Sequence, residues 1–175
     1  MEVVIIEREA LKVVGMKIRT TIEKNEIPQL WERFIARMPE LQEVAVPDCS
    51  LGICLYEGDD FEAGAPFSYL AGVVVKDDSV LPEGMIFHEI PATEVAVFTH
   101  TGSVENLAET YEYIYEEWLP QSGYAIAEAD ELEWYDSRFK YDDPQSQMDI
   151  HVPIKAAEKL SDEDLNDFLD IMNKL

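Results

Sequence analysis

Basic residues are scarce in this chain. Its 175 residues include 13 lysines and arginines against 37 aspartates and glutamates, which gives a formal net charge of −24. A field of this sign repels nucleic-acid backbones and anionic membrane surfaces, and it concentrates cations near the protein. We therefore expect no direct nucleic-acid or membrane partner, and we expect a cationic or amphipathic small molecule, rather than an anion, as the ligand.

Cysteines and long apolar runs are also few. The chain has two cysteines, Cys49 and Cys54, which suits a reducing compartment. Residues 1–15 include Glu2, Glu7 and Glu9, whereas a secretory leader would need an uninterrupted apolar run there. No stretch approaches the roughly 18 consecutive apolar residues of a transmembrane helix. These absences predict a cytoplasmic protein.

The signatures of several enzyme classes are missing. The chain contains no G-x-S-x-G, C-x-x-C or H-E-x-x-H motif and no glycine-rich phosphate loop, so serine hydrolase, zinc and nucleotide chemistry lack support. His88, His100 and His151 have spacings that do not indicate a metal site. We expect no metal and no cofactor. His100 is expected to hold a strand-to-helix turn by a hydrogen bond, and the cysteines are expected to be small buried hydrophobic residues.

What the chain does have is a hydrophobic pattern of the β-α-β-β type. Hydrophobic residues make up 47% of the sequence, enough for one domain or two small packed modules. Strand-like runs cover residues 3–19, with a bend near 10–12, and then 51–56 and 67–75. Between them, apolar residues at helical spacing predict a helix from Ile27 to Met38, with Asn25 as its N-cap.

The same order recurs in the second half. Strand patterns at 85–90 and 95–99 precede a helix that Ser103 caps and Pro120 and Gly123 end, and strand patterns follow at 131–135 and 148–154. The halves align at offsets of about 80 residues, which predicts pseudo-repeats of about 1–78 and 83–157 within a domain of residues 1–157. We expect an α+β fold with antiparallel sheets, flanking helices and a central groove at the seam, where the halves bury their open faces together. Residues 158–175 show an apolar stripe after Ser161 and predict a C-terminal helical extension.

Four segments carry a resemblance to a known family. Ile90–Gly102, Glu117–Gly123, Glu133–Tyr135 and Met148–Lys155, in this order and spacing, resemble the GyrI-like effector-binding domain, which also forms the ligand-binding half of AraC-type and BmrR-type transcription regulators. The resemblance runs over about residues 1–156, and no helix-turn-helix motif precedes it. It implies a stand-alone bacterial domain whose central groove takes hydrophobic or cationic compounds, for sensing or sequestration in transcription regulation or drug resistance.

The resemblance also implies site residues. In the family a glutamate on the strand before the last hairpin faces the pocket among aromatic residues, and Glu133 matches this position. Tyr56, Tyr135 and Trp118 match the aromatic positions more loosely. The family usually has tyrosine beside the glutamate, whereas this chain has Trp134, which leaves open whether Trp134 or Tyr135 faces the groove.

Strand geometry gives a reading of Glu133 from the residues themselves. Alternation along the strand places Glu133 and Tyr135 on one face and Trp134 on the other. If the central strands meet, Glu133 lies opposite Cys54 and between Tyr56 and Tyr135. A carboxylate so placed takes up a proton, finds a donor or binds a cation. A cation against aromatic rings gains about 1–2 kcal/mol per desolvated contact.

Other interpretations stay open at this point. Glu133 could be one more solvated acid among 37, and Trp31 and Trp118 lie on apolar helix stripes where core packing is the usual role, although either could line a groove. Glu133 and a tyrosine could instead act as the general acid or base of a cofactor-independent hydrolase of reactive ring compounds. The family also includes gyrase inhibitors, so the acidic surface and last helix could bind gyrase or a regulator.

Overall fold

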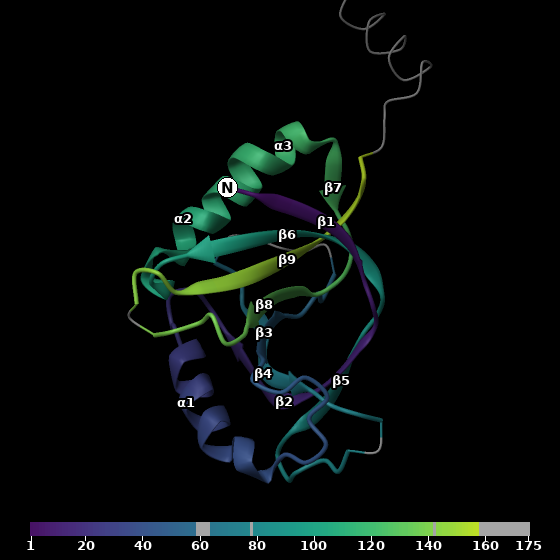
Figure 1. Cartoon of the computed structure of the whole chain (residues 1–175), viewed down its shortest axis with the longest axis vertical. Coiled ribbons are helices and arrows are strands. Elements are labelled where there is room, and N and C mark those ends of the chain that lie inside the picture. Colours follow the sequence, from purple (N-terminus) through teal and green to yellow (C-terminus); the bar gives the residue numbers. More distant parts are fainter. Residues whose placement is uncertain (59–63, 78, 142, 158–175) are drawn as a thin grey trace, which may run out of the picture.

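A single antiparallel sheet with helices on one face forms the protein (Figure 1). The computed structural model describes residues 1–58, 64–77, 79–141 and 143–157. The strands are β1 (Val3–Arg8), β2 (Leu11–Thr20), β3 (Ser50–Cys54), β4 (Phe67–Val74), β5 (Ile86–Ile90), β6 (Thr93–Thr101), β7 (Tyr124–Ile126), β8 (Glu131–Tyr135) and β9 (Gln147–Ala156). The helical segments are α1 (Ile27–Arg37), η1 (Met38–Glu40), η2 (Val104–Asn106), α2 (Leu107–Glu112), η3 (Tyr113–Trp118) and α3 (Leu119–Ser122). The predicted α+β class is confirmed.

The strand order shows how the two halves are joined. It runs β1-β6-β9-β8-β3-β4-β2-β5, with β7 added on β9. The order β3-β4-β2 in the first half therefore matches β8-β9-β6 in the second. The halves meet edge to edge through β3 and β8, where Ile53 lies opposite Leu132. They do not bury open faces against each other as the sequence suggested, because continuing the backbone hydrogen bonds satisfies both central strand edges.

The strand at the outer edge of each half comes, in the sequence, just before the other half. β1 leads into β2 but pairs with β6, and β5 leads into β6 but pairs with β2. The short links Glu9–Ala10 and Pro91–Ala92 therefore cross between the halves. This exchange ties both halves into one unit.

Each helical region covers its own half of the sheet (Figure 1). On the first half, α1 buries Leu30 and Phe34 against residues of β2 and β4. On the second half, Ile114 packs with Phe98 and Ile150. The opposite face of the sheet has its own apolar core, made chiefly of Val13, Cys49, Leu51, Ile53, Leu70, Val74, Ile90 and Leu132. The central strands thus contribute side chains to two separate environments.

The start of α1 differs from the sequence prediction. Glu26 occupies the N-cap position and makes no side-chain capping bond, whereas Asn25 precedes it with a positive φ of 47°. Asparagine is one of the few residues that tolerates this backbone conformation. The predicted Asn25 cap is therefore wrong, and Asn25 serves the turn that leads into the helix.

The second helical region begins at Ser103 and ends at Gly123 as predicted, whereas Pro120, which was also expected to end it, lies inside α3. Ser103 accepts a hydrogen bond from the Glu105 backbone N–H, and Gly123 adopts the left-handed conformation with φ of 77°. His100 contacts Thr110 Oγ1 through Nδ1 at 2.8 Å and the Ser103 carbonyl oxygen through Nε2 at 3.1 Å. Its predicted role at the strand-to-helix turn is confirmed.

The short strand β7 and the C-terminal end of the chain remain to be compared with the sequence predictions. The short strand β7 has no counterpart among the predicted strands, and its length of three residues leaves little pattern to detect. The predicted C-terminal helix of residues 158–175 lies outside the described residues. Over the described ranges, no helix has both the length and the apolar character needed to span a membrane.

Candidate functional site

Strand β8 carries the candidate site on its helix-covered side. Leu132 and Trp134 point into the opposite core, where the Trp134 ring stacks on His151 with centroids 5.5 Å apart. Glu133 and Tyr135 point the other way, and the Tyr135 hydroxyl donates to a Glu133 carboxylate oxygen at 3.0 Å. Tyr135, and not Trp134, therefore shares the face of Glu133.

Glu133 is a buried carboxylate held by tyrosines. The residue is only 9% exposed to solvent. Oε2 accepts hydrogen bonds from Tyr69 at 2.5 Å and Tyr135 at 3.0 Å, and Oε1 accepts one from Tyr111 at 3.2 Å. Within the described residues, no lysine, arginine or histidine forms an ion pair with Glu133. The carboxylate is thus solvated by phenols, and no basic side chain in the described ranges pairs with its charge.

The phenols are suited to this task because they stay protonated. Burial raises the pKa of Tyr69, Tyr111 and Tyr135 well above the ordinary value, and the charge of Glu133 raises each further. At neutral pH all three hydroxyls therefore remain donors. They stabilise a negative charge at Glu133 without neutralising it.

A glycine makes room for the carboxylate. The residue opposite Glu133 on β3 is Gly52, and not Cys54 as the sequence suggested; Cys54 lies opposite Glu131. A Cβ atom added at Gly52 would overlap the Tyr69 hydroxyl and a Glu133 carboxylate oxygen. The cause is the strand register: β3 and β8 are antiparallel and pair two residues away from the alignment that the sequence suggested.

Trp31 joins the cluster from α1. Its indole Nε1 donates to the Tyr69 hydroxyl at 3.3 Å, and its ring meets that of Tyr135 edge to face with centroids 5.2 Å apart. Trp31 is only partly buried. It therefore links the helix to two of the phenols on Glu133 instead of serving the core alone.

A second carboxylate, Glu131, lies on the same face of β8. The Tyr115 hydroxyl donates to Glu131 Oε2, and the Tyr115 ring stacks parallel to that of Tyr111. Burial raises the pKa of Glu131 to about 7, the charge of Glu133 adds to this, and the Tyr115 hydrogen bond opposes it. The site thus contains one acid that titrates near neutrality.

The helix that supplies Tyr115 has an unusual turn. Segment η3 is π-helical, and Tyr115 lies within it, whereas Tyr111 lies in the preceding α2. π-helical turns are rare and occur often at functional sites. Here the wide turn accompanies two stacked tyrosines, each of which donates to a different glutamate.

Two predicted aromatic residues lie elsewhere. Trp118 packs edge to face on Phe98 and parallel to Tyr124, which places it in the core of the second half. Tyr56 lies beyond the end of β3, is 40% exposed, and donates its backbone N–H to Asp130. The expected arrangement of Glu133 between Tyr56 and Tyr135 is replaced by one with Tyr69, Tyr111 and Tyr135.

Sequence reasoning missed several residues of the cluster. Tyr69 follows the alternation of a buried strand, and Tyr111 and Tyr115 lie on the apolar stripe of their helix, where core packing is the usual role. Glu131 shares the strand face of Glu133, a signal that was available. Gly52 gave no signal, since only the register shows what it faces.

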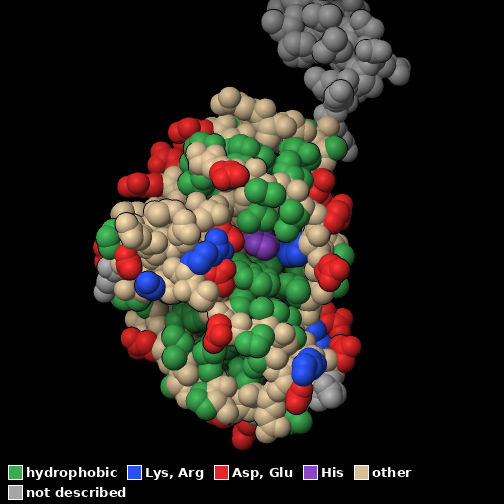
Figure 2. Space-filling model, viewed as in Figure 1, with side chains coloured by type: hydrophobic (Ala, Val, Ile, Leu, Met, Phe, Trp, Pro, Cys, Tyr) green, Lys and Arg blue, Asp and Glu red, His purple; other side chains and the backbone are tan. Residues whose placement is uncertain are grey.

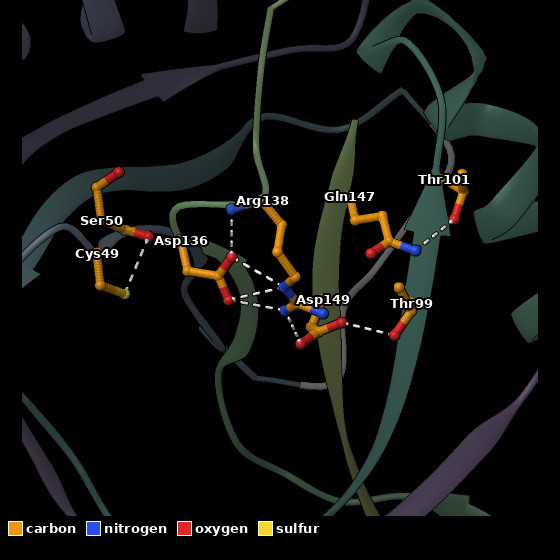
Figure 3. Close-up of polar contacts among 8 residues, drawn as sticks. All are labelled: Cys49, Ser50, Thr99, Thr101, Asp136, Arg138, Gln147 and Asp149. Atoms are coloured by element: carbon orange, nitrogen blue, oxygen red, sulfur yellow. Dashed lines mark hydrogen bonds and ion pairs between the residues drawn. The ribbon is translucent and has the colours of Figure 1, made fainter. Parts of the chain in front are cut away.

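A polar cluster anchors the end of β8 (Figure 3). The Arg138 guanidinium donates to Asp136 Oδ2 at 2.7 Å and to Asp149 Oδ2 at 2.5 Å, and the Thr99 hydroxyl donates to Asp149 Oδ1 at 2.7 Å. The hydrogen bond from Arg138 holds the pKa of Asp136 below its usual range. These contacts fix the loop after β8 to β9 and β6, and so fix the strand that carries Glu133.

Two surface hollows lie away from this cluster. One is lined by Ala10 and Pro91 of the two links, by neighbouring residues of β2 and β5, and by the end of β4. The other is lined by Ile18, Glu26 and other residues of β2 and α1. Neither includes Glu133, so the central groove stays a prediction.

Family comparison identifies the class of protein. The family model described as "GyrI-like small molecule binding domain" matches residues 1–155. The chain therefore belongs to the GyrI-like family, which confirms the resemblance seen in the sequence and relates the chain to small-molecule binding and to transcription regulators.

Individual relatives agree with this assignment. The chain is 38% identical over 151 residues to the transcriptional regulator BrlR of Pseudomonas aeruginosa, covering 86% of this chain and 54% of BrlR, so it spans about half the length of that relative. The structure of SAV2435 bound to tetraphenylphosphonium has a TM-score of 0.67 at 19% identity and covers 89% of this chain and 94% of that one. EcmrR, solved in a complex with DNA, has a TM-score of 0.66 at 17% identity and covers 89% of this chain and 58% of that one. The two structures show a shared fold.

Proposed function

We propose that this chain binds an amphipathic organic cation with Glu133 as the counter-ion. The observation that carries the proposal is a nine-tenths buried carboxylate that three phenols solvate and that no basic side chain of the described residues neutralises. Burying a charge is unfavourable unless it is paired. A bound cation would provide the missing charge.

The surroundings of Glu133 suit a cation with apolar substituents. Trp31, Tyr69, Tyr111 and Tyr135 supply aromatic surface within one or two contacts of the carboxylate. Each desolvated cation–π contact adds about 1–2 kcal/mol, and buried apolar area adds more. The net charge of −24 attracts cations toward the protein. The tetraphenylphosphonium-bound neighbour has the same fold, which supports this ligand class.

The biological role follows from the relatives. A GyrI-like domain related to transcription regulators is suited to sense a compound and pass the signal on, or to sequester it. We propose sensing or sequestration of lipophilic cations, in transcription regulation or resistance to toxic compounds.

A titration with tetraphenylphosphonium tests the proposal. Trp31 lies beside the site, so a saturable change in tryptophan fluorescence is expected, with calorimetry to measure the affinity. Glu133→Gln keeps the side-chain shape but removes the charge and should weaken binding at least about tenfold, since one close ion pair contributes 1.4 kcal/mol or more at a partly desolvated site.

Glu128→Gln provides the matched control. Glu128 is largely exposed and forms a long surface ion pair with Lys155, so this variant has the same net charge as Glu133→Gln. Its affinity should equal that of the wild type. Absence of saturable binding, or equal loss in both variants, would contradict the proposal.

A hydrolytic function is the second candidate, and Glu131 favours it. A carboxyl group with a pKa of about 7 beside a tyrosine hydroxyl has the property required of a general acid or base at neutral pH. We propose strained rings or esters as the substrate class. Hydrolysis of p-nitrophenyl acetate should then be catalytic in the wild type and lost in Glu133→Gln or Glu131→Gln. Product released only once per protein molecule would rule this candidate out.

A further inference from the structure

The opposite face of the sheet contains a buried arginine whose guanidinium has no hydrogen-bond partner in the part of the chain that the structure describes. Arg8 ends β1 and is only 5% exposed. Its Nε, Nη1 and Nη2 atoms are all buried, and none has a hydrogen-bond partner among the described residues. A guanidinium stays charged in proteins and carries five N–H donors. Such a group is rarely left unsatisfied in a folded protein.

A second unsatisfied group lies on the same face. Along β1, Val3 packs in the helix-side core, so Arg8 belongs to the other face by alternation. His151 of β9 also lies there, because it stacks on Trp134 and pairs with Leu132. His151 is 8% exposed, and its Nδ1 has no partner within the described part of the chain.

The acids of this region are already engaged. Asp130 Oδ1 accepts the Tyr56 backbone N–H at 2.8 Å, and Oδ2 contacts His88 Nε2 at 2.6 Å. Asp149 accepts hydrogen bonds from Thr99 and Arg138 (Figure 3). Neither carboxylate provides an acceptor for the Arg8 guanidinium.

The electrostatics agree with a missing anion. Burial lowers the pKa of Arg8, and the charge of Asp130 acts in the opposite sense. Burial lowers the pKa of His151 to about 4, and the charge of Arg8 lowers it further, whereas Asp149 opposes this. At neutral pH the imidazole is therefore neutral, and Arg8 carries a buried charge that no acceptor of the described residues pairs directly.

Apolar side chains share this face of the sheet with Arg8 and His151. Leu132 and Trp134 belong to the core beside His151, and Val4 and Ile6, on the same face of β1 as Arg8, are 50% and 40% exposed. In Figure 2, hydrophobic side chains gather down the middle of the face in view, with a histidine and basic side chains among them. Such surroundings strengthen any interaction with a buried charge.

We propose that Arg8 and His151 form a binding site for a compact monovalent anion, with a carboxylate group as the best match. The fork of guanidinium N–H donors fits the two oxygens of a carboxylate, and the Nδ1–H tautomer of His151 would add a donor. The site is separate from Glu133, which lies on the other face of the sheet. The overall negative charge does not prevent this, because solution ions screen distant charges beyond about 8 Å.

The test measures the thermal stability of the full chain in sodium formate, sodium acetate or sodium chloride, against the sodium salt of 2-(N-morpholino)ethanesulfonate, a bulky anion without a carboxylate group, at equal ionic strength. A ligand that binds only the folded state raises the Tm, by roughly 5–10 °C at one hundred times its Kd for a chain of this size. Stabilisation by formate or acetate alone would assign the site to carboxylates, and stabilisation by chloride as well would assign it to compact anions in general.

Arg8→Met removes the charge and retains an apolar chain of similar reach. The proposal predicts that this variant loses the dependence of Tm on the anion, while Lys24→Met, which removes an exposed charge, retains it. As a measurement on the wild type alone, the Arg8 Nε–H resonance should shift saturably with formate. The same anion response in Arg8→Met, or an unshifted resonance and anion-independent Tm in the wild type, would overturn the proposal.

Discussion

The two central strands, β3 and β8, occupy matching positions in the two halves but carry opposite kinds of residue. Facing the helices, β3 presents Gly52 and Cys54, whereas β8 presents Glu131 and Glu133. Because the strands pair directly, Gly52 lies opposite Glu133 and Cys54 opposite Glu131. One strand supplies charge and the other supplies space. The carboxylate of Glu133 can therefore be buried where the halves meet, because the facing residue of β3 is a glycine that leaves room for it.

The largest effect should come from Gly52→Ala, which removes the space. The added methyl group overlaps the Tyr69 hydroxyl and the Glu133 carboxylate, so the hydrogen bond between them must break. Overpacking and the lost hydrogen bond together predict a loss of about 4 kcal/mol in the free energy of unfolding, measured by urea denaturation. Combining Gly52→Ala with Tyr69→Phe removes one overlapping atom and should recover part of the loss. Additive effects of the two changes would contradict this explanation.

The next effect concerns the charge on β8. Burial raises the pKa of Glu131 from the ordinary 4.5 to about 7 in the folded protein, so the folded state binds more protons than the unfolded state between these values. Stability from this group is therefore present below pH 4.5 and falls as the pH rises to 7, by roughly 3 kcal/mol at most. Urea midpoints at pH 5, 6, 7 and 8 measure this slope.

Glu131→Gln is the control for that slope, because it cannot titrate. The difference in stability between wild type and variant should change with pH mainly between 4.5 and 7. A constant difference over this range would show that Glu131 ionises normally. Affinity for a lipophilic cation should increase as the pH rises from about 6 to 8, because Glu131 ionises in the folded protein around its pKa of about 7 and the ionised carboxylate favours a cation.

Two of the phenols on Glu133 differ in burial and in hydrogen-bond length, which predicts two smaller losses of stability of different size. Tyr69 is 1% exposed and donates at 2.5 Å, whereas Tyr111 donates at 3.2 Å from a partly buried position. Tyr69→Phe should cost about 2 kcal/mol, as for a hydrogen bond to a charged group, and Tyr111→Phe about 1 kcal/mol or less. Denaturation of both variants measures the order. Equal costs would show that the carboxylate does not depend on the shorter bond.

The smallest expected effect is on the reactivity of the two cysteine thiols, which both lie in the first half. Burial raises the pKa of Cys54 well above its ordinary value, and the charges of Glu131 and Glu133 add to this; burial also raises the pKa of Cys49 to about 12. Since the thiolate is the reactive form, both should react with iodoacetamide at pH 8.5 at least about tenfold more slowly than in urea-unfolded protein. Mass spectrometry of the alkylated chain measures the rates. Equal rates in the folded and unfolded chains would contradict the burial of the two thiols.

Much of the fold could be predicted from local patterns. Apolar spacing located α1 and the second helical region, and Ser103 and Gly123 marked the ends of the latter. Strand β8 was placed at residues 131–135, as observed. These elements follow from periodicity and capping, which act over a few residues. The edge-to-edge joining of the halves and the exchange of β1 and β5 depend on pairing between residues far apart, which no local pattern records.

The site was predictable in the same partial way. Glu133 and Tyr135 share a strand face, and period-two alternation is enough to show it. The distant donors Tyr69 and Tyr111 and the space at Gly52 required the register of three strands and the position of a helix. The role of Trp118 could not be predicted, because a residue on an apolar helix stripe can either line a groove or pack in a core. Only its packing on Phe98 decides between the two.

Sequence by itself determined which residues are acidic and which of them share a face of a strand, because charge and alternation are properties of the linear polymer. Tertiary structure alone decided that Glu133 faces a glycine under three phenols and that Arg8 is buried with no acceptor among the described residues. The physical reason is that burial and hydrogen-bond satisfaction depend on which distant segments meet, and those meetings are fixed only when the whole sheet has formed.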